Sequence, residues 1–590
     1  MKFSEFHKKV RKILDIDLPA AGPVINEGRL MAKDVKIGRT AFMDKVGLAS
    51  EVEYKKACIR EKKVMYHAHI GMGSWQATAE ALKFLYRNSQ ELDFKVDRVG
   101  ICLDRRMGLP AKFRDIVPAE TGPMLTGPEE WNHVGSAAPI QPHMGDFMIG
   151  FPASTENTIN ALRAGVTTIG NLSQFFAHEV PMWHDHVHTT FETVRALSIM
   201  GALRDQGALI HSYLEDGYGA LFSDCATIAG WAFLERYIVE ELIGGKLSHC
   251  IGGLTVDPVK RAGWVFALHE IHCHDCVGSM FYGDTISFTH NFTSNRALVS
   301  EYLTWDIMAQ LECPTGHAVL PLPVSEAFRV PSAEEIVESQ ELGRRVEDTA
   351  RRLLPHMDFS LSYQFAHKMV AEGRKVFGNA LDGFKEAGVD VSDPLKFLYL
   401  LKQLGPAVFE EMFGAGEVNS SYLRGRKPVF MTDIFEDSTA CFNSHRQMIS
   451  EHVKNRTLEG RRFLIASTDV HEHAILILNR ILTEVGAKMT YLGAEKNPDK
   501  VVLEACRRKV DAILLSTHNG MALEYAIILK AELKKQKLAI PVIMGGVLNQ
   551  KFEDRPLPID VSQDLKELGF YPYKALDGKL AHFLEFKEEE

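Results

Sequence analysis

The sequence predicts an α/β protein in which a (β/α)₈ TIM-like barrel is followed by a flavodoxin-like domain. The chain has 590 residues, more than one hydrophobic core usually serves. Between residues 64 and 322, short apolar runs alternate about eight times with longer amphipathic segments, which is the repeat of such a barrel. From residue 461 a second strand–helix rhythm covers about 130 residues, enough for one doubly wound domain. For the first region, a large doubly wound sheet is the alternative.

Four segments follow from these patterns. Residues 1–60 are mixed in composition and read as an N-terminal arm or cap, and residues 61–414 form the barrel with additional charged helices from residue 332. Residues 415–460 contain glycine, proline and charges and read as a linker, and residues 461–590 form the second domain. The expected strands are 64–67, 98–103, 147–150, 166–170, 208–211, 250–254, 286–290 and 318–322 in the barrel, and 463–466, 488–492, 512–515 and 541–544 in the second domain.

Composition excludes several classes of protein. The net charge of −10 and the pI near 6.2 argue against a nucleic-acid partner, whose binding domain would be basic. No run of about 18 apolar residues predicts a membrane span, and the first thirty residues do not resemble a signal peptide. Nine scattered cysteines suit a reducing compartment. We therefore expect a cytoplasmic protein without a membrane partner.

Polar side chains follow several of the expected barrel strands. They are His67 with His69, Asp104 to Arg106, Asn171, His211 with Tyr213, and His290 with Asn291. In a barrel these positions converge on the mouth at the carboxyl ends of the strands, where such enzymes place their active sites. The recurrence on five strands predicts a ligand site there.

Three loops of the second domain carry a further candidate site. Asp469 and His471 follow its first strand, Ser516 and Thr517 follow its third, and Gly545-Gly546 follows its fourth. A flavodoxin-like order places these three strands side by side, so their loops line one crevice. His471 could ligate a metal through one ring nitrogen while Asp469 accepts a hydrogen bond from the other. For the first loop alone, Asp469 as a helix N-cap is an equally simple reading.

This domain resembles the cobalamin-binding domain of corrinoid enzymes, whose signature is D-x-H-x-x-G, then S-x-L, then G-G. The resemblance implies that His471 is the lower axial cobalt ligand and that Asp469 holds its second nitrogen. It also implies that Ser516, Thr517, Gly545 and Gly546 line the displaced nucleotide tail of the cofactor. Two positions depart from the signature: Ala474 replaces a glycine and His518 replaces a leucine.

The barrel region resembles, more distantly, the large catalytic subunit of glutamate mutase, in the stretches beginning at Met65, Gly207 and Gly316. The chain is thus similar to adenosylcobalamin-dependent carbon-skeleton mutases, which are isomerases, with the two parts fused. The resemblance implies that Arg106, with Arg105 beside it, orients a substrate carboxylate, with His69 or His211 assisting. Glu326 matches a position near the adenosyl group, although Leu322 replaces a lysine there.

The expected substrate is a small carboxylic acid without an amino group. The segment that supplies an acid for a substrate ammonium in the resembling family reads VTTIGNLSQFF here, with no carboxylate. A branched or unsaturated dicarboxylate such as 2-methyleneglutarate fits better. The alternatives are a corrinoid methyltransferase using methylcobalamin, a glutamate mutase-type activity on an amino acid, and a non-catalytic cobalamin sensor or carrier. We expect a homo-oligomer, either a dimer or a tetramer.

Two further clusters have metal-like spacing. Cys273 and Cys276 form a lone C-x-x-C beside histidines, which is a weak zinc signal without a second pair. His184, His186 and His188 alternate as on a strand or loop and could also bind a metal. Buried thiols and loop histidines are the default interpretation of both.

Overall fold

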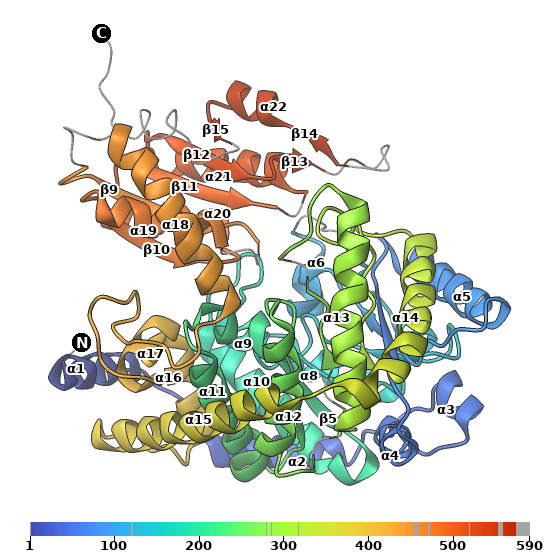
Figure 1. Ribbon diagram of the computed structural model, residues 1–590. Helices are drawn as coiled ribbons and strands as arrows, with labels where there is room; N and C mark the ends of the chain where they lie inside the picture. The colour runs from blue at the N-terminus through green and yellow to red at the C-terminus, as the bar shows by residue number, and fades with distance from the viewer. Residues whose placement is uncertain are drawn as a thin grey trace. The chain divides into compact units, whose positions relative to one another are not determined.

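The protein divides into two compact units, Met1–Asp433 and Ile434–Glu590 (Figure 1). The computed structural model describes residues 2–573 except 118, 120, 121, 276, 279, 285, 317, 453–457, 470–472, 519, 551 and 553–557, and it leaves the side chains of 445–452 and 473 undescribed. Each unit has its own hydrophobic clusters and its own parallel sheet structure, so the fold is mixed α/β.

The first unit contains eight strands whose pairings are all parallel. Five form a sheet in the order β3-β2-β1-β8-β7 and three form a sheet in the order β4-β5-β6. Parallel bridges from Met144 to Ile169 and from Ile251 to Phe281 join residues at the ends of the two sheets. The strands are β1 (Met65–Ile70), β2 (Arg98–Ile101), β3 (Gln141–His143), β4 (Thr168–Ile169), β5 (Leu209–Tyr213), β6 (Leu247–Cys250), β7 (Met280–Phe281) and β8 (Ala318–Val319).

Helices separate these strands along the chain and pack around them (Figure 1). The main ones are α5 (Trp75–Glu91), α8 (Ser154–Arg163), α10 (His186–Ala202), α11 (Cys225–Arg236), α12 (Pro258–Ile271), α13 (Phe292–Glu312) and α14 (Ala333–Leu353). The shorter ones are α6 (Ala111–Arg114), α7 (Pro128–Val134), α9 (Gln174–Ala177) and the 3₁₀ turn η1 (Arg105–Gly108). Alternation of parallel strands with helices explains why both faces of the strands are buried.

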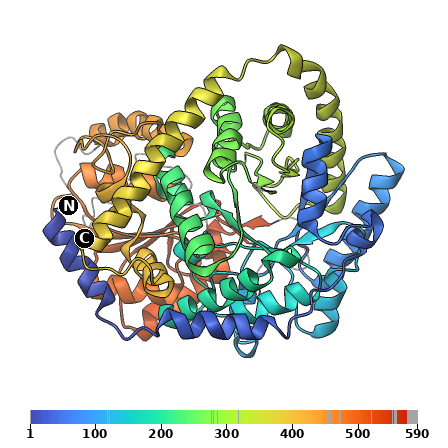
Figure 2. The ribbon, with the colours of Figure 1, turned by 90° about the horizontal axis from the view of Figure 1, so that it is seen from below.

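A long helix, α15 (Ser360–Glu386), packs across α11 and α12 and is seen in yellow in Figure 2. The contact depends on small residues, because a Cβ at Gly230 of α11 would lie 2.6 Å from Cβ of Val376. A Cβ at Gly373 of α15 would likewise lie 2.8 Å from Cβ of Ala229. The helices α16 (Pro394–Leu404) and α17 (Pro406–Phe413) follow it. The charged region after residue 332 is therefore helical, as its periodicity predicts.

The N-terminal segment consists of four helices: α1 (Phe3–Leu14), α2 (Ala21–Ala32), α3 (Ala41–Val46) and α4 (Glu51–Glu61). They belong to the core of the first unit, since Phe6, Val10 and Val24 are buried in its main hydrophobic cluster. Helix α4 also buries Glu51 and Lys55, two charged side chains that carry part of the site described below.

Three predicted strands of the first unit are wrong or displaced. The third strand is β3, Gln141–His143, instead of 147–150, and the seventh is β7, Met280–Phe281, instead of 286–290. The sixth lies at 247–250 instead of 250–254. The true strands are two to four residues long, and β3 and β6 also carry buried polar residues such as Gln141 and His249, so a longer apolar run nearby is the stronger sequence signal.

The second unit has a parallel five-stranded sheet in the order β10-β9-β11-β12-β15. Its strands are β9 (Arg462–Ser467), β10 (Lys488–Gly493), β11 (Ala512–Thr517), β12 (Val542–Gly546) and β15 (Tyr571–Tyr573), with a small antiparallel pair β13 (Asn549–Gln550) and β14 (Ile559–Asp560). This is the flavodoxin-like order that the sequence predicts. The helices are α18 (Asp433–His452), α19 (His473–Glu484), α20 (Pro498–Arg508), α21 (Ala522–Lys535) and α22 (Ser562–Glu567).

Helix α18 lies within the segment that the sequence suggests is a linker. Its residue Phe442 packs against Ile477 and Ile481 of α19, and the guanidinium of Arg480 lies 4.0 Å from the Phe442 ring centroid. The apolar positions of α18 are few, and this is why composition alone favours a looser connection there.

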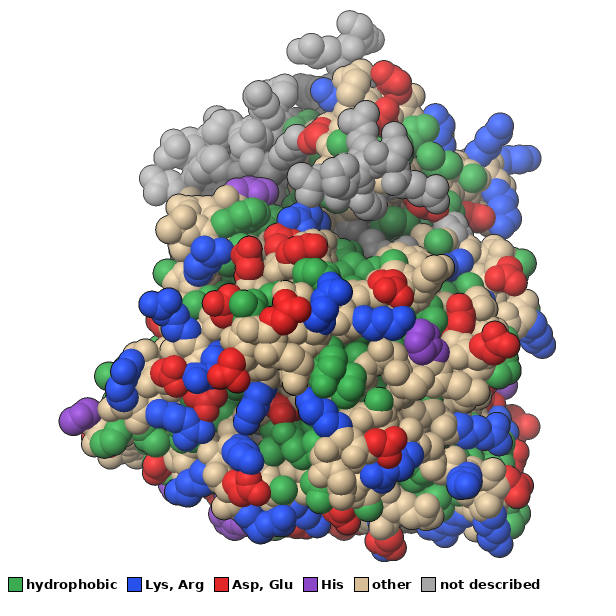
Figure 3. Space-filling model, turned by 90° about the vertical axis from the view of Figure 1, so that its right-hand side faces the viewer, with side chains coloured by type: hydrophobic (Ala, Val, Ile, Leu, Met, Phe, Trp, Pro, Cys, Tyr) green, Lys and Arg blue, Asp and Glu red, His purple; other side chains and the backbone are tan. Residues whose placement is uncertain are grey.

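Charges are interspersed on the surface. On the face shown in Figure 3, lysine and arginine side chains alternate with aspartate and glutamate side chains. Among the residues that the structure describes, none of the helices combines the length and hydropathy needed to cross a bilayer.

Candidate functional site

In the second unit, three strand ends meet at the carboxyl edge of the sheet. Strand β11 lies between β9 and β12, and the register pairs Ser516 with Ser467 on one side and with Gly545 on the other. Thr517 pairs with Gly546, and Asp469 follows the end of β9 by two residues. The sheet therefore brings together the loops that the sequence assigns to one crevice.

Asp469 is buried and held by backbone and side-chain groups. Its Oδ2 accepts a hydrogen bond from the backbone N–H of His518 at 2.6 Å, and its side chain is 5% exposed. Nδ1 of His518 lies 4.0 Å from Oδ1. Asp469 thus ties the loop after β9 to the loop after β11. His471 lies outside the described residues.

The hydroxyls of Ser516 and Thr517 have no hydrogen-bond partner among the residues that the structure describes, although both side chains are buried. Buried hydroxyls are normally bonded, so a group from outside the chain is expected to reach them. Gly546 has φ +94°, and a Cβ there would lie 2.4 Å from the Thr517 carbonyl oxygen. The backbone of the sheet itself therefore requires glycine at this position. The unbonded hydroxyls at this edge fit a bound cofactor.

In the first unit, a cluster of rings lies on one face of the strands. His67 and His69 of β1 have ring centroids 5.0 Å apart, and His143 of β3 lies 6.0 Å from His67 and 4.8 Å from His211 of β5. The predicted residues His69 and His211 therefore belong to one cluster. His143 was missed because its strand was misplaced.

Two tyrosines extend this cluster. Tyr282 Oη lies 2.8 Å from His69 Nε2, and its ring stacks on that of Tyr213 with centroids 4.2 Å apart. Tyr213 was singled out as a residue at the end of a strand, and Tyr282 was not. His69, Tyr213 and Tyr282 are partly exposed, whereas the histidines His67, His143 and His211 are buried.

Burial keeps the imidazoles neutral. Desolvation, with the charge of Arg98 as the second cause, lowers the pKa of His69 to about 4. The same causes lower the pKa values of His67, His143 and His211 well below the ordinary value. His143 Nδ1 donates to the Thr168 carbonyl oxygen at 2.9 Å, since a carbonyl can only accept. The cluster offers polar atoms without charge.

Charged residues lie beside the histidines. Glu51 of α4 is 2.9 Å from Lys55 Nζ and 3.0 Å from Arg98 Nε, and its second oxygen accepts from the Thr168 hydroxyl at 2.8 Å. All three charged side chains are at most 1% exposed. The N-terminal helix α4 therefore supplies a buried carboxylate and a buried ammonium to the interior of the first unit.

The predicted carboxylate-binding arginines lie in η1, after β2. Arg106 is engaged by its neighbour: Nε and Nη2 donate to the two carboxylate oxygens of Asp104 at 2.9 and 3.1 Å. Asp104 also accepts from the Arg106 backbone N–H at 2.8 Å and is 1% exposed. This fixes the orientation of the Arg106 guanidinium. Arg105 lies beside it in the same turn.

A second polar network, which the sequence did not reveal, surrounds Gln174. Its Nε2 donates to Asp146 Oδ1 at 3.2 Å and to Asp216 Oδ2 at 2.8 Å, and Asn171 Nδ2 donates to the same Asp216 oxygen at 2.8 Å. His178 Nε2 lies 3.2 Å from the other Asp216 oxygen. The carboxylates of Asp146 and Asp216 therefore lie beside the segment 166–176, VTTIGNLSQFF, which contains no acidic residue itself.

The misplaced third strand explains why Asp146 was overlooked. A strand at 147–150 would put Asp146 before a strand, whereas β3 at 141–143 puts it after the carboxyl end. The misplaced seventh strand had the opposite result for His290 and Asn291: a strand at 286–290 would put them at its carboxyl end, whereas β7 ends at Phe281. Both are exposed, and Asn291 accepts from the backbone N–H groups of Thr293 and Ser294 as the N-cap of α13.

Glu326 lies in the segment after β8, and its side chain is half-buried. Desolvation, reinforced by the charge of Glu335, raises its pKa to about 7. The carboxyl group can therefore be present in both protonation states near neutral pH.

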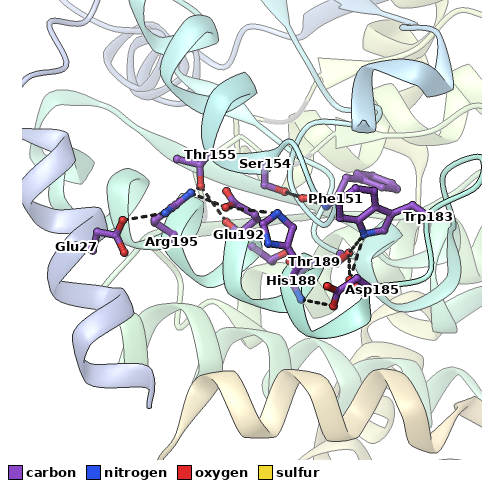
Figure 4. A network of polar contacts seen from close by, with 11 residues as sticks. Glu27, Phe151, Ser154, Thr155, Trp183, Asp185, His188, Thr189, Glu192 and Arg195 are labelled. Atoms are coloured by element: carbon purple, nitrogen blue, oxygen red, sulfur yellow. Dashed lines mark hydrogen bonds and ion pairs between the residues drawn. The ribbon is translucent and has the colours of Figure 1, made fainter. Parts of the chain in front are cut away.

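Of the three closely spaced histidines, His184 lies in a loop, as expected, whereas His186 and His188 lie in the first turn of α10, which corrects the expectation for these two. Figure 4 shows the N-cap residue Asp185 accepting from the His188 backbone N–H at 2.9 Å. His188 Nε2 lies 3.8 Å from Glu192, and Arg195 connects α10 to Glu27 of α2 at 2.8 Å. These contacts make the segment part of the helix packing around α10.

Cys273, the other metal candidate, is exposed, and Cys276 lies outside the described residues. The neighbouring His272 is buried, and its Nε2 lies 2.9 Å from Nδ1 of His249. Within the described ranges, no group of three or more histidine, cysteine, aspartate or glutamate side chains is arranged to hold a metal ion.

Comparison with known protein families identifies one domain. Residues 464–561 match the B12 binding domain family. No curated protein matches the chain. The match begins in β9 and reaches β14, and thus spans Asp469, Ser516, Thr517, Gly545 and Gly546. The chain therefore contains a cobalamin-binding domain.

Proposed function

We propose that the protein is an adenosylcobalamin-dependent carbon-skeleton mutase, an isomerase that rearranges a small dicarboxylic acid such as 2-methyleneglutarate. The matched B12 binding domain supports the cofactor, and the ring cluster of the first unit supports a substrate site. The match supports cobalamin in general, and we propose the adenosyl form and the mutase reaction.

We infer that the first unit is a closed (β/α)₈ barrel. Its two parallel sheets end on strands that two parallel bridges connect, Met144 to Ile169 and Ile251 to Phe281. In such a ring β1 and β5 lie opposite each other. Tyr213 of β5 stacks on Tyr282, which contacts His69 of β1, as expected for side chains that point into one interior.

The cofactor would be held by the residues at the carboxyl edge of the second sheet. By its place in the sequence motif His471 would bind the cobalt, and Asp469 would orient it. The unbonded hydroxyls of Ser516 and Thr517 suit polar groups of the nucleotide tail, and Gly545 and Gly546 pair with these two residues in the sheet. When bound, adenosylcobalamin supplies a radical initiator through homolysis of its cobalt–carbon bond.

The observation that carries the substrate assignment is the neutral, buried ring cluster. His69 and Tyr282 lie at its partly exposed edge and can hydrogen-bond a carboxylate without exchanging a proton with it at neutral pH. The rings exclude water from the interior, which protects reactive intermediates. Arg106, whose charge is paired with that of Asp104, would hydrogen-bond the acid through its remaining N–H groups.

A second candidate is the same type of reaction on an amino acid. The carboxylates of Asp146 and Asp216, which share the Gln174 amide, would supply the counter-charge for a substrate ammonium. Although the segment VTTIGNLSQFF contains no carboxylate, Asp146 and Asp216 from outside it would serve an amino-acid substrate in that role.

The test is an anaerobic EPR spectrum of the full chain loaded with adenosylcobalamin, with and without 2-methyleneglutarate. We expect a cob(II)alamin signal coupled to an organic radical only with substrate. Labelling histidine with ¹⁵N should change the cobalt hyperfine pattern, and His471→Gln should abolish that change, whereas His473→Gln is the matched control that should retain it.

Other outcomes separate the alternatives. A signal with glutamate but not with 2-methyleneglutarate would favour the amino-acid reaction. A silent spectrum with both, together with turnover of methylcobalamin, would replace the mutase by a methyltransferase. Binding of cobalamin without turnover of either form would favour a sensor or carrier.

A further inference from the structure

Among the buried side chains of the first unit with polar atoms that lack a hydrogen-bond partner within the described residues, four belong to neighbouring strands. The atoms are both ring nitrogens of His67, both ring nitrogens of His211, the terminal nitrogens of Arg98 and the hydroxyl of Ser248. Each side chain is at most 2% exposed. Buried donors are normally bonded, so an additional group is expected to satisfy them.

The strand register gathers these four residues. His67 pairs with Arg98 across β1 and β2, and His211 pairs with Ser248 across β5 and β6. The ring of His143 lies between the two histidines, with centroid distances of 6.0 and 4.8 Å.

Alternation along the strands places Ser248 on the same face as His211. Its neighbour His249 points the other way, where Nε2 lies 3.2 Å from Glu235 of α11. Ser212 also points that way, because its hydroxyl is bonded to that of Ser173 at 2.8 Å. The polar atoms without partners therefore converge on the inner face of the strands.

Positive charge lies beside this place. Glu51 lies 2.9 Å from Lys55 Nζ and 3.0 Å from Arg98 Nε, so two buried cations share this carboxylate. The nearby histidines His67, His69, His143 and His211 are neutral, since burial lowers their pKa values. A buried guanidinium whose terminal nitrogens have no acceptor among the described residues is unfavourable.

We propose that this place, the interior floor formed by Arg98, His67, His211 and Ser248, is a binding site for a small monovalent anion. Arg98 Nη1 and Nη2, the Ser248 hydroxyl and one N–H of each histidine would donate to it, and its negative charge would lie beside the Arg98 guanidinium. The anion is either an inorganic ion such as chloride or a carboxylate group of the substrate. Only the second identification rests on the proposed function.

The first test is crystallographic. Crystals of the full chain grown without chloride are soaked in sodium bromide, and anomalous diffraction is recorded at the bromine edge. We expect a bromide peak in contact with Arg98 and Ser248. Soaking with 2-methyleneglutarate as well distinguishes the sources: loss of the peak identifies a substrate carboxylate, and an unchanged peak identifies a structural inorganic anion. Ordered water alone on these atoms would overturn the proposal.

A solution test uses a matched pair of serines. The unfolding midpoint of the first unit is followed by tryptophan fluorescence while bromide replaces gluconate at constant ionic strength; all six tryptophans, Trp75 to Trp305, lie in this unit. We expect the midpoint to rise with bromide. Ser248→Ala should raise the midpoint in gluconate, because it removes a buried hydroxyl without a partner, and weaken the apparent bromide affinity several-fold, because that hydroxyl bonds the anion.

Ser212→Ala is the control on the adjacent strand. It should lower the midpoint in gluconate, because it removes the bond to Ser173, and keep the rise with bromide. Equal bromide responses of the wild type and Ser248→Ala would contradict the proposal. Neither serine test depends on cobalamin or on turnover, so a negative EPR result and a negative anion result remain distinguishable.

Discussion

At the scale of single residues, burial decides which groups in this protein carry charge. The inner histidines stay neutral because they are desolvated and lie near Arg98. Burial also favours the neutral form of Glu326, an acid: desolvation, with the charge of Glu335, raises its pKa to about 7. The amino acid sequence alone would assign the ordinary pKa value to each of these groups.

Glu326 therefore lowers the stability of the native state at alkaline pH. Its folded pKa is above the unfolded value, so its contribution falls as pH rises from about 4.5 to about 7 and is constant above that. At pH 8.5 we expect Glu326→Gln to raise the free energy of unfolding, measured by urea denaturation, by roughly 2 kcal/mol over the wild type. At pH 5.5 the gain should be smaller.

The control for that experiment is Glu338→Gln, an exposed glutamate of α14. It should not show the same dependence on pH. A gain for Glu326→Gln that is equal at both pH values would mean that Glu326 is not protonated preferentially in the native state.

At the scale of elements, one buried ion pair connects several segments of the first unit. Arg261 of α12 donates through Nε and Nη2 to Asp306 of α13, at 2.9 and 2.6 Å. The same guanidinium donates to the carbonyl oxygens of Gly252, Thr255 and Tyr282 at 2.7 to 2.8 Å. Arg261 thus fixes the end of β6, the start of α12 and Tyr282 of the ring cluster.

We expect Arg261→Met to destabilise the first unit by about 3 to 5 kcal/mol, because it leaves Asp306 buried without its partner. The double variant Arg261→Met, Asp306→Leu should recover part of this loss, since no charge then remains buried. Urea unfolding followed by tryptophan fluorescence measures both. A double variant no more stable than the single one would indicate that the bonds to the three carbonyl oxygens carry the effect.

At the scale of the whole molecule, the chain consists of two units with separate hydrophobic clusters. All tryptophans belong to the first and the B12 binding domain belongs to the second. Each unit can thus be followed by its own signal.

Cobalamin should therefore stabilise one calorimetric transition more than the other. At a hundred times its Kd, the cofactor adds about 2.7 kcal/mol to the free energy of unfolding of the domain that binds it. We expect scanning calorimetry to show this shift in the transition of the second unit. That transition is recognised as the one that tryptophan fluorescence of the cobalamin-free protein does not follow, since all tryptophans lie in the first unit. If both transitions moved together, the two units would unfold as one.

The candidate site could be predicted from the sequence wherever it depends on a strand and the loop that follows. Asp469, Ser516 and Gly545 are examples, because parallel strands in a flavodoxin-like order place successive loops at one edge. His143, Asp146 and Tyr282 were not found, because β3 and β7 are two or three residues long and carry no apolar run.

The sequence by itself determined the α/β class, the strand order of the second unit and the loops of its cobalamin-binding edge, because these follow from local patterns of apolar and polar residues. Only the tertiary structure decided that Glu51 of an N-terminal helix pairs with Arg98, and that Gln174 joins Asp146 to Asp216. Such contacts join polar residues that lie 28 to 47 positions apart in the sequence. Their charges and partners depend on burial in the folded chain, and hydrophobic periodicity does not indicate which polar side chains are buried.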